Sequence, residues 1–73
     1  MDAATARDLL LLAEDARELR RRQDPAAERL VEERYPELVQ ALGWYVEAGQ
    51  FDQAGRLATA LVTFWIATKR VAA

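Results

Sequence analysis

The spacing of apolar residues constrains the fold of this chain more than any other feature of its sequence. Apolar side chains recur every three or four positions through most of the 73 residues, and no stretch alternates apolar and polar residues as a strand does. This period places the apolar side chains along one side of a helix. We therefore expect an all-α fold of four short helices, paired as antiparallel helical hairpins, with residues 1–73 forming a single helical domain.

The first two predicted helices lie before residue 36. The first opens at Thr5, a favourable N-cap residue, and ends at three arginines, Arg20–Arg22, whose charges suit the negative end of a helix dipole. The second opens at Asp24-Pro25, because Asp is a favoured N-cap and Pro is favoured in the first turn. Residues 1–35 hold seven of the ten basic and nine of the twelve acidic residues, so we expect a charged helical pair there.

Pro36 separates the second predicted helix from the third. Proline has no amide N–H, and it disfavours helical geometry at the preceding residue, here Tyr35. Two outcomes stay open: the helix ends near Arg34 and a new helix starts at Pro36, or one long helix kinks there. The sequence favours a break or a sharp kink.

Residues 36–73 are predicted to form an aromatic-rich helical hairpin. The third helix runs from Pro36 to Ala48 and ends at Gly49, since glycine commonly adopts the left-handed conformation that follows a helix. The fourth runs from Asp52 to Val71 and is apolar over much of its circumference. Such a pattern is typical of a helix that is buried on more than one side.

The amino-acid composition argues against an enzyme. The chain has no His and no Cys, which removes the commonest general base, thiol nucleophiles and the usual zinc ligands. Its carboxylates lie among arginines on polar helix faces, and four short helices leave little room for a catalytic pocket. We predict no cofactor and no metal. With no disulfides, no basic leader and no long apolar run, we expect a cytoplasmic protein that does not enter a membrane.

Two other functions stay open. A small-molecule-sensing helical domain is the main alternative, with the aromatic residues forming a pocket, although aromatics at helical spacing more often belong to the core. The run Arg20–Arg22 offers charges to a nucleic-acid phosphate, but the net charge of −2 makes nucleic acid an unlikely partner. There is no glycine-rich phosphate loop, and Gly43 and Gly55 are predicted instead to let helices approach closely.

The fourth predicted helix carries more apolar surface than a domain of this size readily buries. On this helix we select Val62, Trp65 and Ile66 as candidate interface residues. On the third helix we select Trp44, because it lies off the main apolar stripe and because Trp is common at interface hot spots. These residues predict a non-catalytic protein–protein interaction module that self-associates, most simply as a symmetric homodimer.

Most of the chain resembles a known family. The segment Gly49-Gln50-Phe51-Asp52-Gln53-Ala54 resembles the turn of a tetratricopeptide repeat, a two-helix unit that stacks on its neighbours. A closer similarity is to the tetratricopeptide-like helical region of actinobacterial LuxR-type and related ATPase-containing transcriptional regulators. The residues that carry it are Glu37-Leu38-Val39-Gln40-Ala41-Leu42-Gly43-Trp44, Arg56-Leu57-Ala58-Thr59-Ala60-Leu61 and Phe64-Trp65. The resemblance implies a tetratricopeptide-like scaffold in transcription regulation, with no catalytic or nucleotide-binding residue to carry over.

Overall fold

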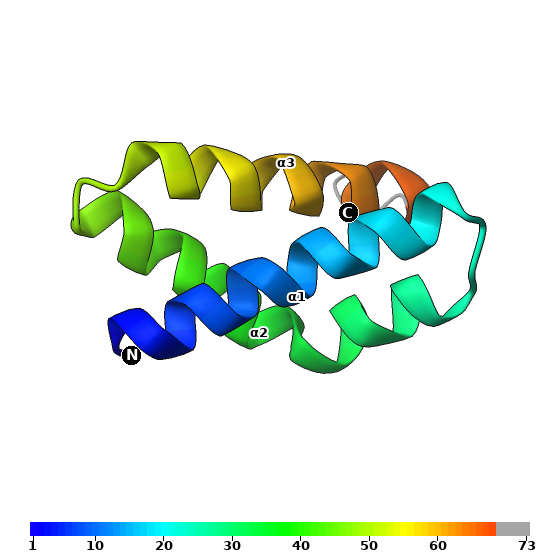
Figure 1. The fold of residues 1–73 in the computed structure, drawn as a ribbon, viewed down its shortest axis with the longest axis horizontal. Coiled ribbons are helices and arrows are strands. Elements are labelled where there is room, and N and C mark those ends of the chain that lie inside the picture. Colours follow the sequence, from blue (N-terminus) through cyan, green and yellow to red (C-terminus); the bar gives the residue numbers. More distant parts are fainter. Residues whose placement is uncertain (69–73) are drawn as a thin grey trace.

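The computed structural model describes residues 1–68 and contains three α-helices in that part of the chain. α1 spans Ala3–Arg21, α2 spans Ala26–Glu47 and α3 spans Phe51–Thr68. Residues 1–68 include no strand, so the predicted all-α fold class is confirmed. Each helix packs against the other two, and α1 crosses in front of α2 while α3 runs along one side of the pair (Figure 1). The predicted helix end at Val71 lies outside the described residues.

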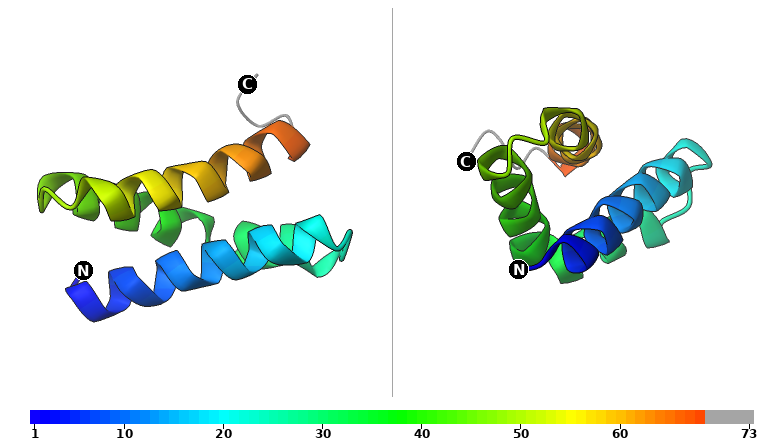
Figure 2. Two further views of the ribbon diagram at one scale, coloured as in Figure 1. Left: turned by 45° about the horizontal axis from the view of Figure 1, so that its top comes forward. Right: turned by 60° about the vertical axis from the view of Figure 1, so that its left-hand side comes forward.

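The second and third predicted helices are one helix in the structure. α2 continues through Pro36, and its ribbon changes direction in its middle (Figure 2, right). Val31 before the proline and Leu38 after it are both buried, so the core holds both halves of α2. Arg34 also donates two hydrogen bonds, each of 2.9 Å, to the Glu37 carboxylate across the proline. The predicted count of four helices is not confirmed, and α2 corresponds to the alternative of one kinked helix.

Side-chain hydrogen bonds define where the first two helices begin. α1 starts before the predicted Thr5, because the Asp2 carboxylate accepts the Thr5 N–H at 2.8 Å and caps the helix instead. The same hydrogen bond holds the pKa of the Asp2 carboxyl below its usual value. At the start of α2, Pro25 is the N-cap residue and the Asp24 carboxylate accepts the Ala26 N–H at 3.0 Å, so the cap lies one residue later than the predicted Asp24.

The turns after α1 and α2 share one backbone pattern. Gly49 has a φ of 74°, and the amide of the next residue donates to the Tyr45 carbonyl at 2.9 Å. Gln23 has a φ of 60°, and the amide of the next residue donates to the Leu19 carbonyl at 2.9 Å. This is the Schellman motif, which reverses the chain within a few residues. The predicted helix end at Gly49 is confirmed, and Gln23 takes the same left-handed conformation without being glycine.

One apolar core joins the three helices. No polar or charged residue is buried within the described part of the chain. The bulkiest fully buried side chains are leucines contributed by all three helices: Leu9, Leu38, Leu57 and Leu61. Of the helices in residues 1–68, none combines the length and the apolar character that crossing a membrane requires.

Candidate functional site

Large exposed apolar side chains are unevenly distributed over the described residues. There are seven of them, and five belong to α2 and α3. Val39 and Val46 lie on α2, whereas Phe51, Val62 and Ile66 lie on α3. Phe51 and Ile66 are the most exposed, at 69% and 73%. The α2–α3 hairpin therefore carries most of the large exposed apolar side chains in the described part of the chain.

The contacts of α3 show which way its exposed residues point. Arg56 marks the side toward α1, since its guanidinium donates hydrogen bonds of 2.6 and 2.9 Å to the Glu14 carboxylate. Trp65 marks the side toward α2, since its indole N–H donates to the Tyr35 hydroxyl at 2.7 Å. Val62 precedes Trp65 by three residues and so lies beside it on the helix surface. The exposed residues of α3 therefore border α2 on a side turned away from α1.

The exposed valines of α2 lie on the matching side of that helix. The Tyr35 ring packs on the Phe64 ring of α3 with 5.9 Å between centroids, so Tyr35 faces α3. Val39 follows Tyr35 by four residues and Val46 follows Val39 by seven, which continues the same side of the helix. Val39 and Val46 thus border α3 on one side of the hairpin, and Val62 borders α2 on the same side.

An uncharged stripe runs along the exposed side of α3, flanked by Asp52 and Arg56, which are also exposed. We call it the outer stripe, and it consists of Phe51, Gly55, Ala58, Thr59, Val62 and Ile66. Its one polar side chain, Thr59, donates its hydroxyl to the Gly55 carbonyl at 2.8 Å. Trp65 and Tyr35, at the edge of the stripe, hydrogen bond to each other. Covering this surface would leave no charge and no polar side chain without a partner, so the desolvation cost is low.

The structure brings three of the four predicted interface residues together. Val62 and Ile66 belong to the outer stripe, and Trp65, half-buried, lies at its edge. Trp44 lies on another side of α2, where its ring meets the Tyr45 ring edge-on with 5.3 Å between centroids. The sequence did not predict Val39, Val46 or Phe51 as interface residues. The sequence offered a signal for the two valines, because a separation of seven residues places Val39 and Val46 on one side of a helix.

Trp44 instead lines an open groove of about 390 Å³ between α1 and the end of the α2–α3 hairpin. Arg7 and Leu11 of α1 line its other side, with Gln50 and Arg56 at one end. The aromatic residues expected to share one pocket are divided between two groups, and Phe51, which is exposed, belongs to neither. One is the pair in this groove, Trp44 and Tyr45, and the other packs between α2 and α3.

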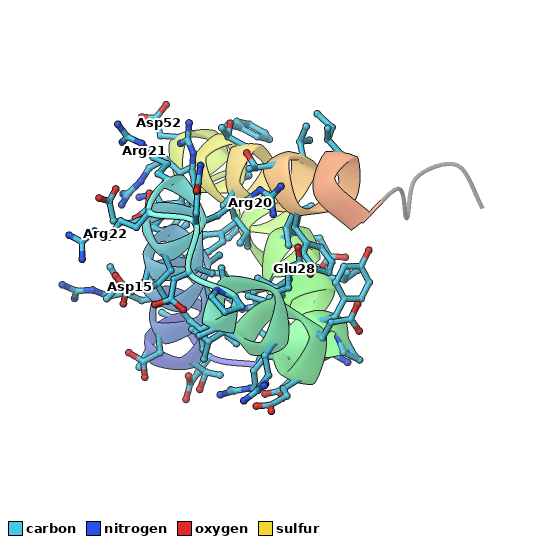
Figure 3. The ribbon with its side chains drawn as sticks, turned by 90° about the vertical axis from the view of Figure 1, so that its right-hand side faces the viewer. Asp15, Arg20, Arg21, Arg22, Glu28 and Asp52 are labelled. Carbon is cyan, nitrogen blue, oxygen red and sulfur yellow. The ribbon has the colours of Figure 1, made fainter. Side chains whose placement is uncertain are left out.

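The basic run at the end of α1 is surrounded by carboxylates. Arg20 lies 3.3 Å from a Glu28 oxygen, while Arg21 and Arg22 lie 3.5 and 3.6 Å from the Glu18 carboxylate. Figure 3 shows Arg20 on the side of the other helices and Arg21 and Arg22 at the periphery of the molecule. The carboxylates offset the positive field that a nucleic-acid phosphate would meet, which weakens this alternative.

The described residues contain no group of three or more His, Cys, Asp or Glu side chains that could hold a metal ion. No protein-family model, curated protein or solved structure matches this chain. The candidate site is the outer stripe of α3 together with the valines beside it, Val39 and Val46. Their chemistry is apolar, uncharged and suited to covering by another apolar surface.

Proposed function

We propose that this protein is a non-catalytic protein–protein interaction module that self-associates through the outer stripe of α3. The observation that supports this proposal is the uncharged apolar surface formed by the stripe with Val39 and Val46. Burying apolar surface contributes about 25 cal/mol for each Å². A small monomer seldom exposes a large apolar patch, and such patches commonly mark sites of protein contact.

A second copy of the chain suits this surface better than a charged partner does. In a symmetric dimer the same patch meets itself, so a charge near the symmetry axis would lie close to its own copy. The outer stripe has no charge and avoids that repulsion. An ordinary stable interface buries about 800 Å² on each partner. That is about a sixth of the 4899 Å² that the chain exposes.

The same proposal includes a scaffold role of the kind that the resemblance to helical regions of transcriptional regulators implies. The support for a tetratricopeptide-like arrangement is local: α2 and α3 form a tight antiparallel hairpin around Gly49 (Figure 1). Tetratricopeptide units use such hairpins to stack on their neighbours through apolar faces. Under this proposal the outer stripe is the stacking face, and self-association occurs in the cytoplasm.

Sedimentation equilibrium over the micromolar range tests self-association. We expect the native chain to form a dimer and the Val62→Glu variant to stay monomeric, because a buried unpaired carboxylate is strongly unfavourable. Leu11→Glu is the matched control, since Leu11 of α1 is 47% exposed and Val62 is 43% exposed. The control variant should dimerise as the native chain does. A native chain that is monomeric at high micromolar concentration, or equal loss of dimer in both variants, would refute the proposal.

Small-molecule sensing is a second candidate, which the groove beside Trp44 favours. A volume of about 390 Å³ falls within the usual range for ligand sites. A compound bound there would raise the melting temperature by binding linkage. We expect such a shift in the native chain and its loss in the Trp44→Ala variant. A broad screen of small aromatic and carboxylate compounds that produces no shift would remove this candidate.

A further inference from the structure

The separations between successive residues of the outer stripe are the same counted from either end. Its members in chain order are Phe51, Gly55, Ala58, Thr59, Val62 and Ile66. Successive members are four, three, one, three and four positions apart. Its midpoint lies between Ala58 and Thr59, which are small, and its ends are Phe51 and Ile66, the two most exposed large apolar residues described. A stripe with this order can lie against a reversed copy of itself.

Gly55 has no evident role within the fold of a single chain. It lies inside α3, where glycine is less favourable than alanine. A Cβ added at Gly55 would meet no atom within 4 Å, and the same is true of Gly43 in α2. Gly49 is the glycine with a positive φ, so neither Gly43 nor Gly55 is needed for its backbone conformation. The close approach predicted at Gly43 and Gly55 therefore does not occur between helices of one chain.

We propose that α3 pairs antiparallel with α3 of a second copy, about a twofold axis that passes between Ala58 and Thr59. This proposal rests on the self-association proposed above and specifies its geometry. In this pairing Phe51 lies opposite the partner's Ile66, and Gly55 lies opposite the partner's Val62. The symmetry repeats both contacts, so that four contacts flank the axis.

The side chains fit this pairing by size. The backbone left bare at Gly55 receives the branched side chain of the partner's Val62, and small residues at the axis let the two helices approach closely. A parallel pairing would instead place Gly55 against its own copy and leave a gap between them. It would also align the two helix dipoles, whereas an antiparallel pairing opposes them. The antiparallel arrangement is therefore the one that the order of residues in the stripe favours.

Disulfide cross-linking tests the pairing, because the native chain has no Cys and each introduced thiol reports on one position. A disulfide requires Cα atoms roughly 4.4–6.8 Å apart. The Thr59→Cys variant should form a covalent dimer under mild oxidation, since Thr59 lies beside the axis. Positions 51 and 66 are separated by about 22 Å along the helix. The Phe51→Cys and Ile66→Cys variants should therefore not cross-link alone, whereas an equimolar mixture of the two should.

Leu11→Cys serves as the control for random collision and should give no covalent dimer above background. Cross-linking of Phe51→Cys with itself would show a parallel pairing and overturn the antiparallel one. A chain that sediments as a dimer while neither Thr59→Cys nor the mixture cross-links would also overturn the pairing, and it would leave the proposed self-association standing. A monomeric chain at high micromolar concentration would overturn both, and equal cross-linking of the control would overturn the pairing.

Discussion

α3 has one apolar side that packs into the core and a second apolar side that is exposed to solvent. The inner side packs into the core, and its large residues Leu57, Leu61 and Phe64 are almost completely buried. The outer stripe is just as poor in charge, yet the rest of the chain leaves it open, with Val62 and Ile66 exposed. Packing within one chain explains the inner side completely. Packing within one chain does not explain the outer side, and we propose that a second copy of the protein covers it.

The largest effect on folding is expected at the inner side. Leu61→Ala removes a fully buried side chain and leaves a cavity, which should lower the free energy of unfolding by about 2–5 kcal/mol. The neighbouring Val62→Ala variant should change it by less than about 0.5 kcal/mol when measured on the monomer, because Val62 is exposed there. Urea unfolding at low protein concentration measures both. Comparable losses in the two variants would remove the distinction between the sides.

Gly55→Ala should change folding and pairing in opposite directions. Alanine is about 1 kcal/mol more favourable than glycine inside a helix, and its Cβ meets no atom of the same chain. The monomer should therefore gain up to about 1 kcal/mol of stability. Dimerisation should weaken, since the methyl group occupies the space proposed for the partner's Val62.

Gly43→Ala is the matched control for that variant, since position 43 is equally open and lies on α2, outside the α3 pairing. It should stabilise the monomer by a similar amount and leave dimerisation nearly unchanged. Thermal unfolding at low concentration and sedimentation at high concentration separate the two effects. Stronger dimerisation of Gly55→Ala than of the native chain would contradict the proposed close contact.

Added salt should affect the proposed dimer weakly. The outer stripe has no charge, so screening has little to act on when the ionic strength rises from about 0.05 to about 0.5 M. An association through Arg20–Arg22 would weaken steeply over the same range. The dissociation constant, measured by sedimentation at both ionic strengths, distinguishes these cases. A strong salt dependence would place the contact elsewhere on the molecule.

The smallest effect is expected at the third side of α3, where Arg56 binds Glu14 of α1. Hydrogen bonds from Arg56 hold the pKa of the Glu14 carboxyl below its usual value. The stability that this carboxylate contributes is therefore fully present above the ordinary Glu pKa, and it is lost as the pH falls through the lowered pKa of the folded state. The Arg56 side chain is 53% exposed and the Glu14 side chain 34%, so solvent screens the pair and the contribution is small.

Glu14→Gln tests that contribution. It should lower the melting temperature slightly at neutral pH and flatten its decline in acid, because the variant has no carboxyl to protonate at position 14. Melting curves across the acidic range, recorded for the native chain and the variant, measure the difference. Curves that fall in parallel through the acidic range would show that Glu14 does not contribute in this way.

Local patterns were sufficient to predict most of the fold. Apolar spacing predicted the helices, and Gly49 follows the end of α2 as the sequence predicts. The sequence favoured a break at Pro36 because proline locally disfavours helical geometry. Tertiary packing outweighs this preference, since residues on both sides of the proline are buried and α2 is continuous. Thr5 was the wrong cap because Asp2, three residues earlier, also has a capping side chain, and the sequence alone does not decide between them.

The candidate surface could be predicted only in part. The wide apolar circumference of the fourth predicted helix led to Val62 and Ile66. Recognising that Val39 and Val46 border the same surface requires knowing which side of α2 faces α3 and which faces α1. That information comes from contacts between residues distant in sequence, such as Tyr35 with Trp65. Trp44 was selected because it lies off the main apolar stripe of the third predicted helix. That position does not show which other helix Trp44 lies beside.

The proline within α2 also bears on how this protein moves. Helices open locally where their hydrogen-bond ladder is interrupted, and Pro36 supplies no amide proton at that point. The amide hydrogens in the two halves of α2 can therefore exchange with solvent at different rates. The half after Pro36 carries Val39 and Val46, beside the outer stripe. Binding of a second copy would slow exchange there and in α3, and it would leave the half before Pro36 exchanging as it does in the monomer.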